Sequence, residues 1–166
     1  MTRSRGTPLA HAELNALAAI STDVDLAACV LYTTHEPCAM CAAAIEFPGL
    51  GEVRFLASDP SSGVDGEAYS SGHSASVWVV VANALFLHNV ARVAGESSEI
   101  VEHHAGAEPE TVGLAMELLQ SGSLVETGDA SSLGAVLGRH WRSIESAAAA
   151  RNARLNRTTR GGRGDS

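Results

Sequence analysis

The feature that most constrains this 166-residue chain is a set of metal-binding side chains in two short segments. The first segment is His11 to Glu13 (HAE), and the second is Pro37 to Cys41 (PCAMC). Zinc prefers nitrogen and sulfur ligands in a four-coordinate site, and a catalytic site keeps one position for water. One histidine and two thiolates supply three ligands. The pattern therefore predicts a fold that brings His11 beside Cys38 and Cys41, with Zn²⁺ as the cofactor.

The residues around these segments predict how the three ligands meet. The predicted elements are a helix over His11–Ile20, a strand over Leu26–Thr33, a helix over Pro37–Ile45 and a strand over Glu52–Ala57. Cys38 and Cys41 are three residues apart in the first turn of their helix, so they share one face. The positive end of that helix favours the thiolates that zinc needs. Two helix starts are thus expected to converge on one ion.

Glu13 stands two residues from the histidine and is not needed as a ligand. Beside a zinc-activated water, its carboxylate can accept a proton and pass it on, so Glu13 is the predicted catalytic residue. Two other interpretations remain open at this point. One is a thioredoxin-like dithiol, and the other is a structural zinc site, which requires a fourth protein ligand. His35 lies nearest, but in a loop before Pro37 it is expected to face solvent or form a pocket wall.

Three stretches of the chain resemble the cytidine/deoxycytidylate deaminase-like family. They are residues 7–17 (TPLAHAELNAL), residues 31–41 (LYTTHEPCAMC) and the strand Glu52–Ala57. The order H-x-E then P-C-x-x-C is the signature of zinc deaminases. The resemblance is greatest to the branch with tRNA adenosine deaminases, guanine deaminases and bacterial nucleoside deaminases. It covers residues 7–60 and becomes vague afterwards.

The resemblance implies an α/β fold, a three-layer α/β/α sandwich, and usually a homodimer. It also implies hydrolytic deamination of a nucleobase, nucleoside or nucleotide. In the family mechanism zinc-bound hydroxide attacks the ring carbon, Glu13 shuttles the proton, and ammonia leaves. The backbone at Ala12 is then expected to line the substrate pocket.

The chain departs from the family before the first motif. Family members carry about 40–50 residues there, enough for a helix and a β-hairpin, whereas ten residues precede His11 here. The first helix and hairpin are therefore expected to be missing, and the hairpin's substrate-contacting asparagine has no match. An inactive deaminase-like zinc-binding fragment stays open as the alternative to an active enzyme.

Beyond residue 57 the patterns are weaker. They predict a loop over Ser58–Gly72, a helix over Val77–Val93, a third strand over Glu99–His103, and helices over Glu108–Gln120 and Leu133–Leu155. The expected organisation is a deaminase core over 1–107, C-terminal helices packing on it over 108–156, and a disordered basic tail over 157–166. Cys29, Trp78 and Phe86 are expected in the core. The remaining histidines are expected to lie on the surface or to be hydrogen-bonded in the core, because they have no partners at metal-ligand spacing; they are His73, His88, His103, His104 and His140.

Charge and hydropathy limit the possible partners. The net charge is −8, and residues 139–166 hold seven arginines against two acidic residues, so the rest of the chain carries −13. An acidic body disfavours a large nucleic-acid footprint. A small nucleobase or nucleoside is thus the expected partner, with tRNA as the alternative. The run Val77–Leu87 is too short to cross a bilayer, and no secretory signal is apparent, so a cytoplasmic location without membrane contact is expected.

Overall fold

The computed structural model describes residues 9–60, 69–71, 77–124 and 130–161. The chain divides into two compact units, an N-terminal unit (Met1–His73) and a C-terminal unit (Ser74–Ser166). This division falls earlier in the chain than the boundary expected after residue 107. The two units are described separately below.

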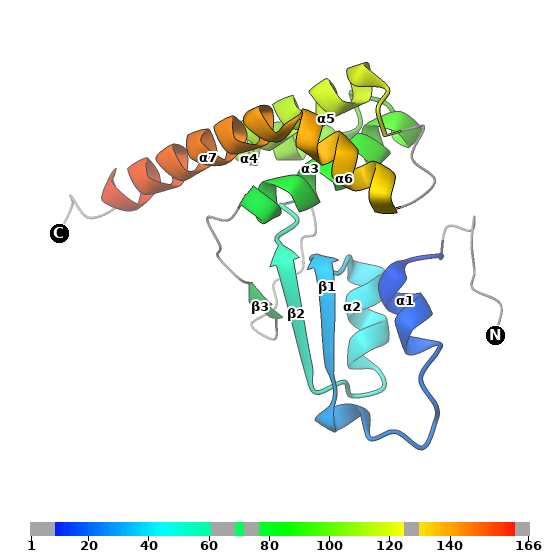
Figure 1. Cartoon of the computed structure of the whole chain (residues 1–166). Coiled ribbons are helices and arrows are strands. Elements are labelled where there is room, and N and C mark those ends of the chain that lie inside the picture. The colour runs from blue at the N-terminus through cyan, green and yellow to red at the C-terminus, as the bar shows by residue number, and fades with distance from the viewer. Residues whose placement is uncertain (1–8, 61–68, 72–76, 125–129, 162–166) are drawn as a thin grey trace. The chain divides into compact units, whose positions relative to one another are not determined.

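The N-terminal unit is a small parallel sheet with two α-helices (Figure 1). Its elements are α1 (Ala12–Leu17), the 3₁₀ helix η1 (Leu26–Ala28), β1 (Val30–His35), α2 (Ala39–Glu46), β2 (Glu52–Ala57) and β3 (Tyr69–Ser71). The strands form one sheet in the order β1-β2-β3, and both strand pairs are parallel. Helix α2 makes the crossover between β1 and β2, as parallel strands require.

The two faces of this sheet differ in burial. Residues of β1 alternate between exposed and half-buried, and Val53, Phe55 and Ala57 of β2 are buried. Helices α1 and α2 contact each other and lie on one side of the sheet (Figure 1). On the outer face Tyr32 is exposed, with the Arg54 guanidinium 5.9 Å from its ring centroid. The α/β class is confirmed, and the helix layer over a parallel sheet is compatible with the predicted sandwich.

The start of β1 differs from the sequence prediction. The predicted strand Leu26–Thr33 begins instead as η1, because the Asp25 carboxylate accepts a hydrogen bond from the Ala27 N–H at 3.1 Å and caps a turn. The strand itself runs from Val30 to His35. Cys29 therefore lies before the strand, half-buried, with its thiol 3.4 Å from the Asp25 carbonyl oxygen. Its predicted place in the core is wrong.

The C-terminal unit is helical. Its elements are α3 (Val77–Ala94), α4 (Glu99–Ala107), α5 (Pro109–Ser121), α6 (Ala130–Arg139) and α7 (Trp141–Gly161). Helices α3, α5 and α7 contact one another and bury a core that includes Leu87, Leu118 and Ile144. By length and composition alone α3 could span a membrane. Because Val80, Ala84 and Leu87 on it are fully buried, we interpret α3 as the central core helix of this unit.

Several predictions in this half of the chain are corrected. Residues Glu99–His103, predicted as a strand, lie in α4, where Val101 and His104 are buried at helical spacing. The single helix predicted over Leu133–Leu155 is two helices, α6 and α7, separated at His140. Helix α7 continues to Gly161, into the predicted disordered tail. Strand β3 lies in the predicted loop 58–72, of which residues 61–68 and 72, like His73, are outside the described residues.

Trp78 and Phe86 on α3 have different surroundings. Phe86 packs against the core, as predicted, and its ring centroid lies 5.9 Å from that of His104. Trp78 is 51% exposed and lies 6.1 Å from Trp141, so its predicted core position is wrong.

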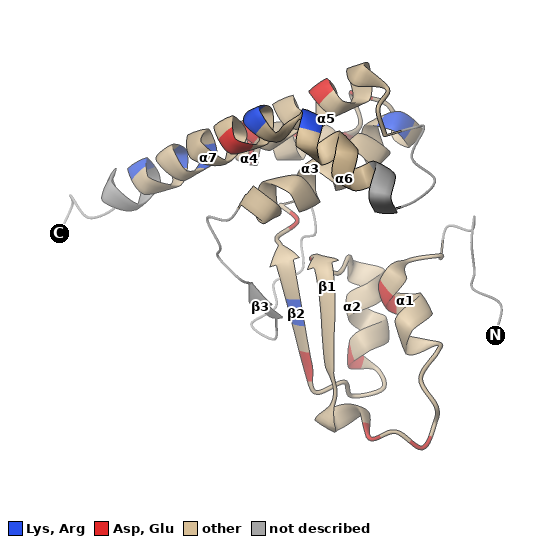
Figure 2. Ribbon diagram, viewed as in Figure 1, with Lys and Arg blue, Asp and Glu red and all other residues tan. Residues whose placement is uncertain are grey.

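Arginines of α7 pair with acidic residues at the α4–α5 junction. Figure 2 shows basic residues at several positions along α7. The Glu108 carboxylate is buried and accepts hydrogen bonds from Arg151 Nε at 2.8 Å, Asn83 Nδ2 at 3.1 Å and Thr111 Oγ1 at 3.3 Å. Arg154 Nε donates to Glu110 at 3.0 Å. These arginines tie α7 to the rest of the helical unit.

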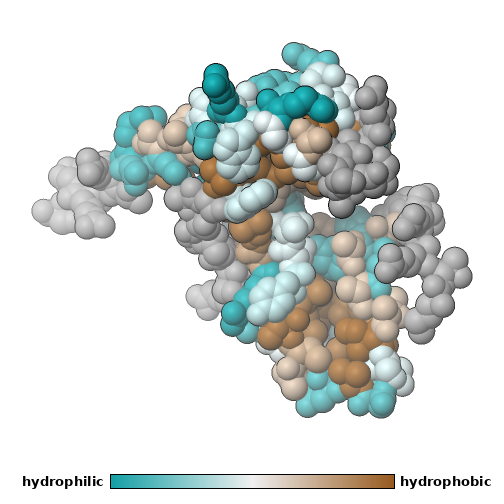
Figure 3. Space-filling view, viewed as in Figure 1, coloured by the Kyte–Doolittle hydropathy of each residue, from teal (hydrophilic) through white to brown (hydrophobic). Residues whose placement is uncertain are grey.

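Apolar side chains also lie on the surface of the N-terminal unit (Figure 3). Among the described residues of this unit, the large exposed apolar side chains are Leu9, Val24, Val30, Tyr32 and Phe47. Phe47 is 94% exposed at the end of α2. Part of the apolar surface of this unit is therefore exposed.

Candidate metal centre

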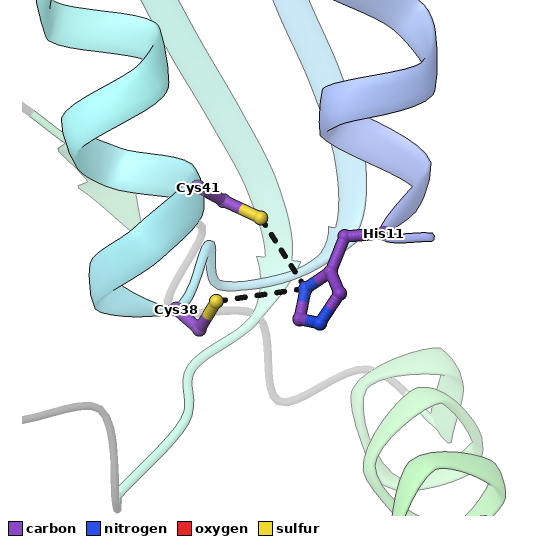
Figure 4. Close-up of side chains that lie close together, drawn as sticks. All are labelled: His11, Cys38 and Cys41. Atoms are coloured by element: carbon purple, nitrogen blue, oxygen red, sulfur yellow. Dashed lines mark hydrogen bonds between the residues drawn. The ribbon is translucent and has the colours of Figure 1, made fainter. Parts of the chain in front are cut away.

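Three side chains from the two motifs meet at one end of the N-terminal unit (Figure 4). The Nδ1 atom of His11 lies 3.5 Å from the Sγ of Cys38 and 3.3 Å from the Sγ of Cys41. All three ligand atoms lie within 4.8 Å of one another. Among the described residues, no other group of three or more His, Cys, Asp or Glu side chains has this spacing.

Local backbone geometry explains how the ligands converge. His11 is the N-cap of α1 and Cys38 is the N-cap of α2, and both have extended backbones with ψ of 148° and 166°. Pro37 is buried immediately before Cys38 and restricts how the chain enters α2. Cys41 stands in the first turn of α2 and is fully buried. The two helix starts thus meet as the sequence predicts, although α2 begins at Ala39 and not at Pro37.

The spacing of these ligands fits zinc. Zinc bonds of about 2.05 Å to nitrogen and about 2.3 Å to sulfur, at a tetrahedral angle, place the two ligand atoms about 3.6 Å apart. The two nitrogen–sulfur distances are 3.5 and 3.3 Å. Soft thiolates with an imidazole are also the donor set that zinc prefers. Three protein ligands leave a fourth position, which is the pattern of a catalytic site.

The electrostatics of the metal-free site disfavour the Cys41 thiolate. Burial raises the pKa of the Cys41 thiol well above its ordinary value, and the Glu13 carboxylate and Cys38 raise it further. The sequence argument expected the helix start to lower thiol pKa values. For the metal-free Cys41 thiol, burial outweighs any such lowering, because desolvation disfavours the thiolate. A bound metal ion supplies the positive charge that a buried thiolate requires.

Glu13 lies beside the three ligands but outside their group. One carboxylate oxygen, Oε1, accepts a hydrogen bond from the Thr33 hydroxyl at 3.1 Å. The other, Oε2, lies 3.6 Å from the Sγ of Cys41. The group of mutually close ligand atoms includes His11, Cys38 and Cys41 and does not include Glu13. This position suits a carboxylate that exchanges protons with a molecule at the metal.

Other residues near the site were predicted with mixed success. Ala12 is the exposed first residue of α1, next to His11. His35 is not in a loop: it ends β1 and is half-buried. The contact from Thr33 was missed. Strand alternation would have placed Thr33 on the same face as Leu31 and His35, toward α1, but a threonine in a strand carries no chemical signal by itself.

The other described histidines all lie in the C-terminal unit. His104 is fully buried with Nδ1 2.9 Å from the Ile100 carbonyl oxygen, and His140 Nδ1 lies 2.9 Å from Glu117. Burial, with Arg92 nearby, lowers the pKa of His88. His103 is exposed. These residues contact helices of their own unit and belong to no metal-binding group among the described residues.

Comparison with known proteins gives one match. Residues 1–57 match the sequence model of the cytidine and deoxycytidylate deaminase zinc-binding region. The match covers about a third of the chain and contains His11, Glu13, Cys38 and Cys41. No curated protein and no solved structure matches the chain. The N-terminal unit thus contains a segment that is similar to a deaminase zinc-binding region, and Zn²⁺ is the cofactor that its ligands are arranged to bind.

Proposed function

We propose that this protein is a zinc-dependent hydrolase that removes an amino group from a nucleobase, nucleoside or nucleotide. One observation carries the proposal. The Glu13 carboxylate lies beside, and outside, a His11–Cys38–Cys41 ligand group within a segment that matches a deaminase zinc-binding region. A structural zinc site would use a fourth protein ligand. A dithiol site would have no use for the histidine and the carboxylate.

The roles of the residues follow from their chemistry. His11, Cys38 and Cys41 hold the metal, which supplies Lewis acidity and makes a water molecule nucleophilic near neutral pH. Water adds to the ring carbon that bears the amino group. Glu13 takes one proton from that water and delivers it to the ring nitrogen, and it then takes the remaining proton of the added hydroxyl and delivers it to the departing amine. The carbon–nitrogen bond breaks, ammonia leaves, and the product carries a carbonyl oxygen. The backbone at Ala12 is our candidate for a substrate contact.

A small substrate is favoured over tRNA. A tRNA enzyme needs cationic surface to neutralise phosphates, and the chain before residue 139 carries −13. Arg151 and Arg154 of the basic C-terminal segment pair with Glu108 and Glu110. We therefore favour a free base or nucleoside as substrate. The resemblance of the motifs to the deaminase-like family favours a homodimer, and we propose a cytoplasmic location. Deamination of adenosine in tRNA is the alternative, because the PCAMC sequence also suits that branch.

An ammonia-release assay tests this proposal. Purified protein with measured zinc content is incubated with guanine, cytosine, adenosine or cytidine, and treated tRNA is sequenced for inosine. We expect turnover of at least one small substrate by the wild type and by Glu46→Ala, a control at an exposed position of α2. Glu13→Ala should keep its zinc and release no ammonia. Inosine in tRNA without small-molecule turnover would favour the alternative, and zinc-loaded wild type inactive on every substrate would favour the inactive zinc-binding fragment.

A further inference from the structure

We propose that Thr33 is a positioning residue, whose hydroxyl holds the Glu13 carboxylate by a hydrogen bond and keeps it from binding the metal. The inference rests on the zinc site of the proposed function. Glu13 can move protons only if the fourth metal position stays available to water. A carboxylate this close to the ligands is itself a good zinc ligand. Some feature of the fold must therefore hold it back.

The position of Glu13 shows why restraint is needed. A zinc-bound sulfur and a zinc-bound carboxylate oxygen, at about 2.3 Å and 2.1 Å from a tetrahedral ion, lie about 3.6 Å apart. The distance between Glu13 Oε2 and Cys41 Sγ is 3.6 Å. The distance between these two atoms is thus the one expected if both bound the same zinc ion. Glu13 stays outside the ligand group because it is too far from at least one of the other two ligands.

Thr33 supplies the restraint from the sheet. It lies in the middle of β1, half-buried, and its Oγ1 donates to Glu13 Oε1 at 3.1 Å. The same oxygen lies 3.1 Å from the His35 carbonyl oxygen. A hydroxyl has one proton, and a carboxylate is a stronger acceptor than a peptide carbonyl. We therefore assign the Thr33 proton to Glu13.

No other described residue performs this role. Among the described residues, Thr33 makes the one N–H or O–H hydrogen bond to the Glu13 carboxylate, and the remaining contact is the Cys41 thiol. In the metal-free protein the Cys41 thiol contact draws Glu13 toward the ligands, and once Cys41 is a metal-bound thiolate the positive ion attracts the carboxylate instead. The Thr33 hydroxyl holds Glu13 toward the sheet in both states. Loss of the hydroxyl should let the carboxylate turn toward the metal.

The test uses Co²⁺ in place of zinc, because its visible spectrum reports the ligand set and because substrate is not required. Wild type and variants are loaded with Co²⁺, and azide is titrated as a probe of the open position. The variants are Thr33→Val, which removes the hydroxyl with little change in shape, and Thr33→Ser, which keeps it. Thr34→Val is the matched control, since Thr34 is adjacent and exposed on the other face.

The expected results separate the alternatives. Azide affinity should fall at least about tenfold in Thr33→Val, an effect typical of losing a partner that orients a group at a metal site. Thr33→Ser and Thr34→Val should resemble the wild type, and Thr33→Val combined with Glu13→Ala should recover azide binding. Wild-type azide affinity in Thr33→Val would overturn the inference. Failure of the wild type to bind Co²⁺ would overturn both the inference and the proposed function, whereas these results without any ammonia release would reject the proposed function alone.

Discussion

Replacing Arg151 with alanine should destabilise the C-terminal helical unit by about 3 kcal/mol. The Arg151 side chain is 13% exposed and its partner Glu108 is 11% exposed, so removing the guanidinium leaves a nearly buried carboxylate without a cation. Breaking a buried ion pair from one side costs about 3–5 kcal/mol. Asn83 and Thr111 still donate to Glu108 in the variant, which places the expected cost at the lower end of that range.

Two further variants make the interpretation specific. Arg154→Ala removes a more exposed pair, with Arg154 27% exposed, and should cost only about 1 kcal/mol. The double variant Glu108→Gln with Arg151→Met removes both charges but keeps an acceptor for Asn83. It should be more stable than Arg151→Ala, because most of the cost comes from the unpaired charge and not from lost attraction.

Tryptophan fluorescence during urea unfolding is the assay. The chain contains two tryptophans, Trp78 and Trp141, and both belong to the C-terminal unit. Their rings lie 6.1 Å apart, between α3 and the start of α7. The signal therefore reports this unit without interference from the zinc-binding unit. Equal destabilisation by Arg151→Ala and Arg154→Ala would refute the reasoning about burial.

Two more predictions concern the N-terminal unit. Gly51→Ala should destabilise it by roughly 2–3 kcal/mol, because a Cβ there meets the Ala27 carbonyl oxygen. Gly49→Ala should cost only about 1 kcal/mol, because Gly49 has a positive φ of 75° but a Cβ there meets no other atom. Zinc release during urea unfolding measures the stability of both variants. The second prediction concerns pH and follows from the raised pKa of Cys41. Metal-free protein should keep the full stability contribution of this thiol below pH 9.0, which is the ordinary pKa of a thiol, and should lose that contribution as the pH rises further. Zinc-loaded protein should show no such loss and should release metal in acid instead, which unfolding midpoints and metal content across pH will show.

The sequence predicted the ligand set because metal chemistry restricts residue type and spacing. His11, Cys38 and Cys41 meet as expected, since each lies at the start of a helix flanking one strand. Thr33 was not predicted. Its contact with Glu13 depends on how α1 packs against β1, which is a tertiary fact that no local pattern encodes.

Secondary structure was predictable where the apolar pattern was long or clearly bounded. The strand Glu52–Ala57 has the predicted bounds, α3 ends one residue later than predicted, and α5 is shifted by one residue at both ends. Short apolar runs were ambiguous. The Ile100–Val101 pair favoured a strand locally, but burial of Val101 and His104 on one helical face decided the structure.

Polar side chains caused the remaining errors. The Asp25 carboxylate caps a 3₁₀ turn and delays β1, and His140, bound to Glu117, separates two helices that composition alone would join. Such contacts depend on a single side chain and its neighbours in space, so they leave little trace in the hydrophobic pattern.

Metal content is the most direct test of the central claim that His11, Cys38 and Cys41 form a zinc site. Wild type, Cys38→Ser, Cys41→Ser and Cys29→Ser are purified identically, dialysed against metal-free buffer and measured by elemental analysis. Cys29 is the third cysteine of the chain and belongs to no metal-binding group among the described residues, so it is the matched control. We predict one zinc per chain in wild type and Cys29→Ser, with loss in Cys38→Ser and Cys41→Ser. Full zinc occupancy in Cys38→Ser would contradict the account.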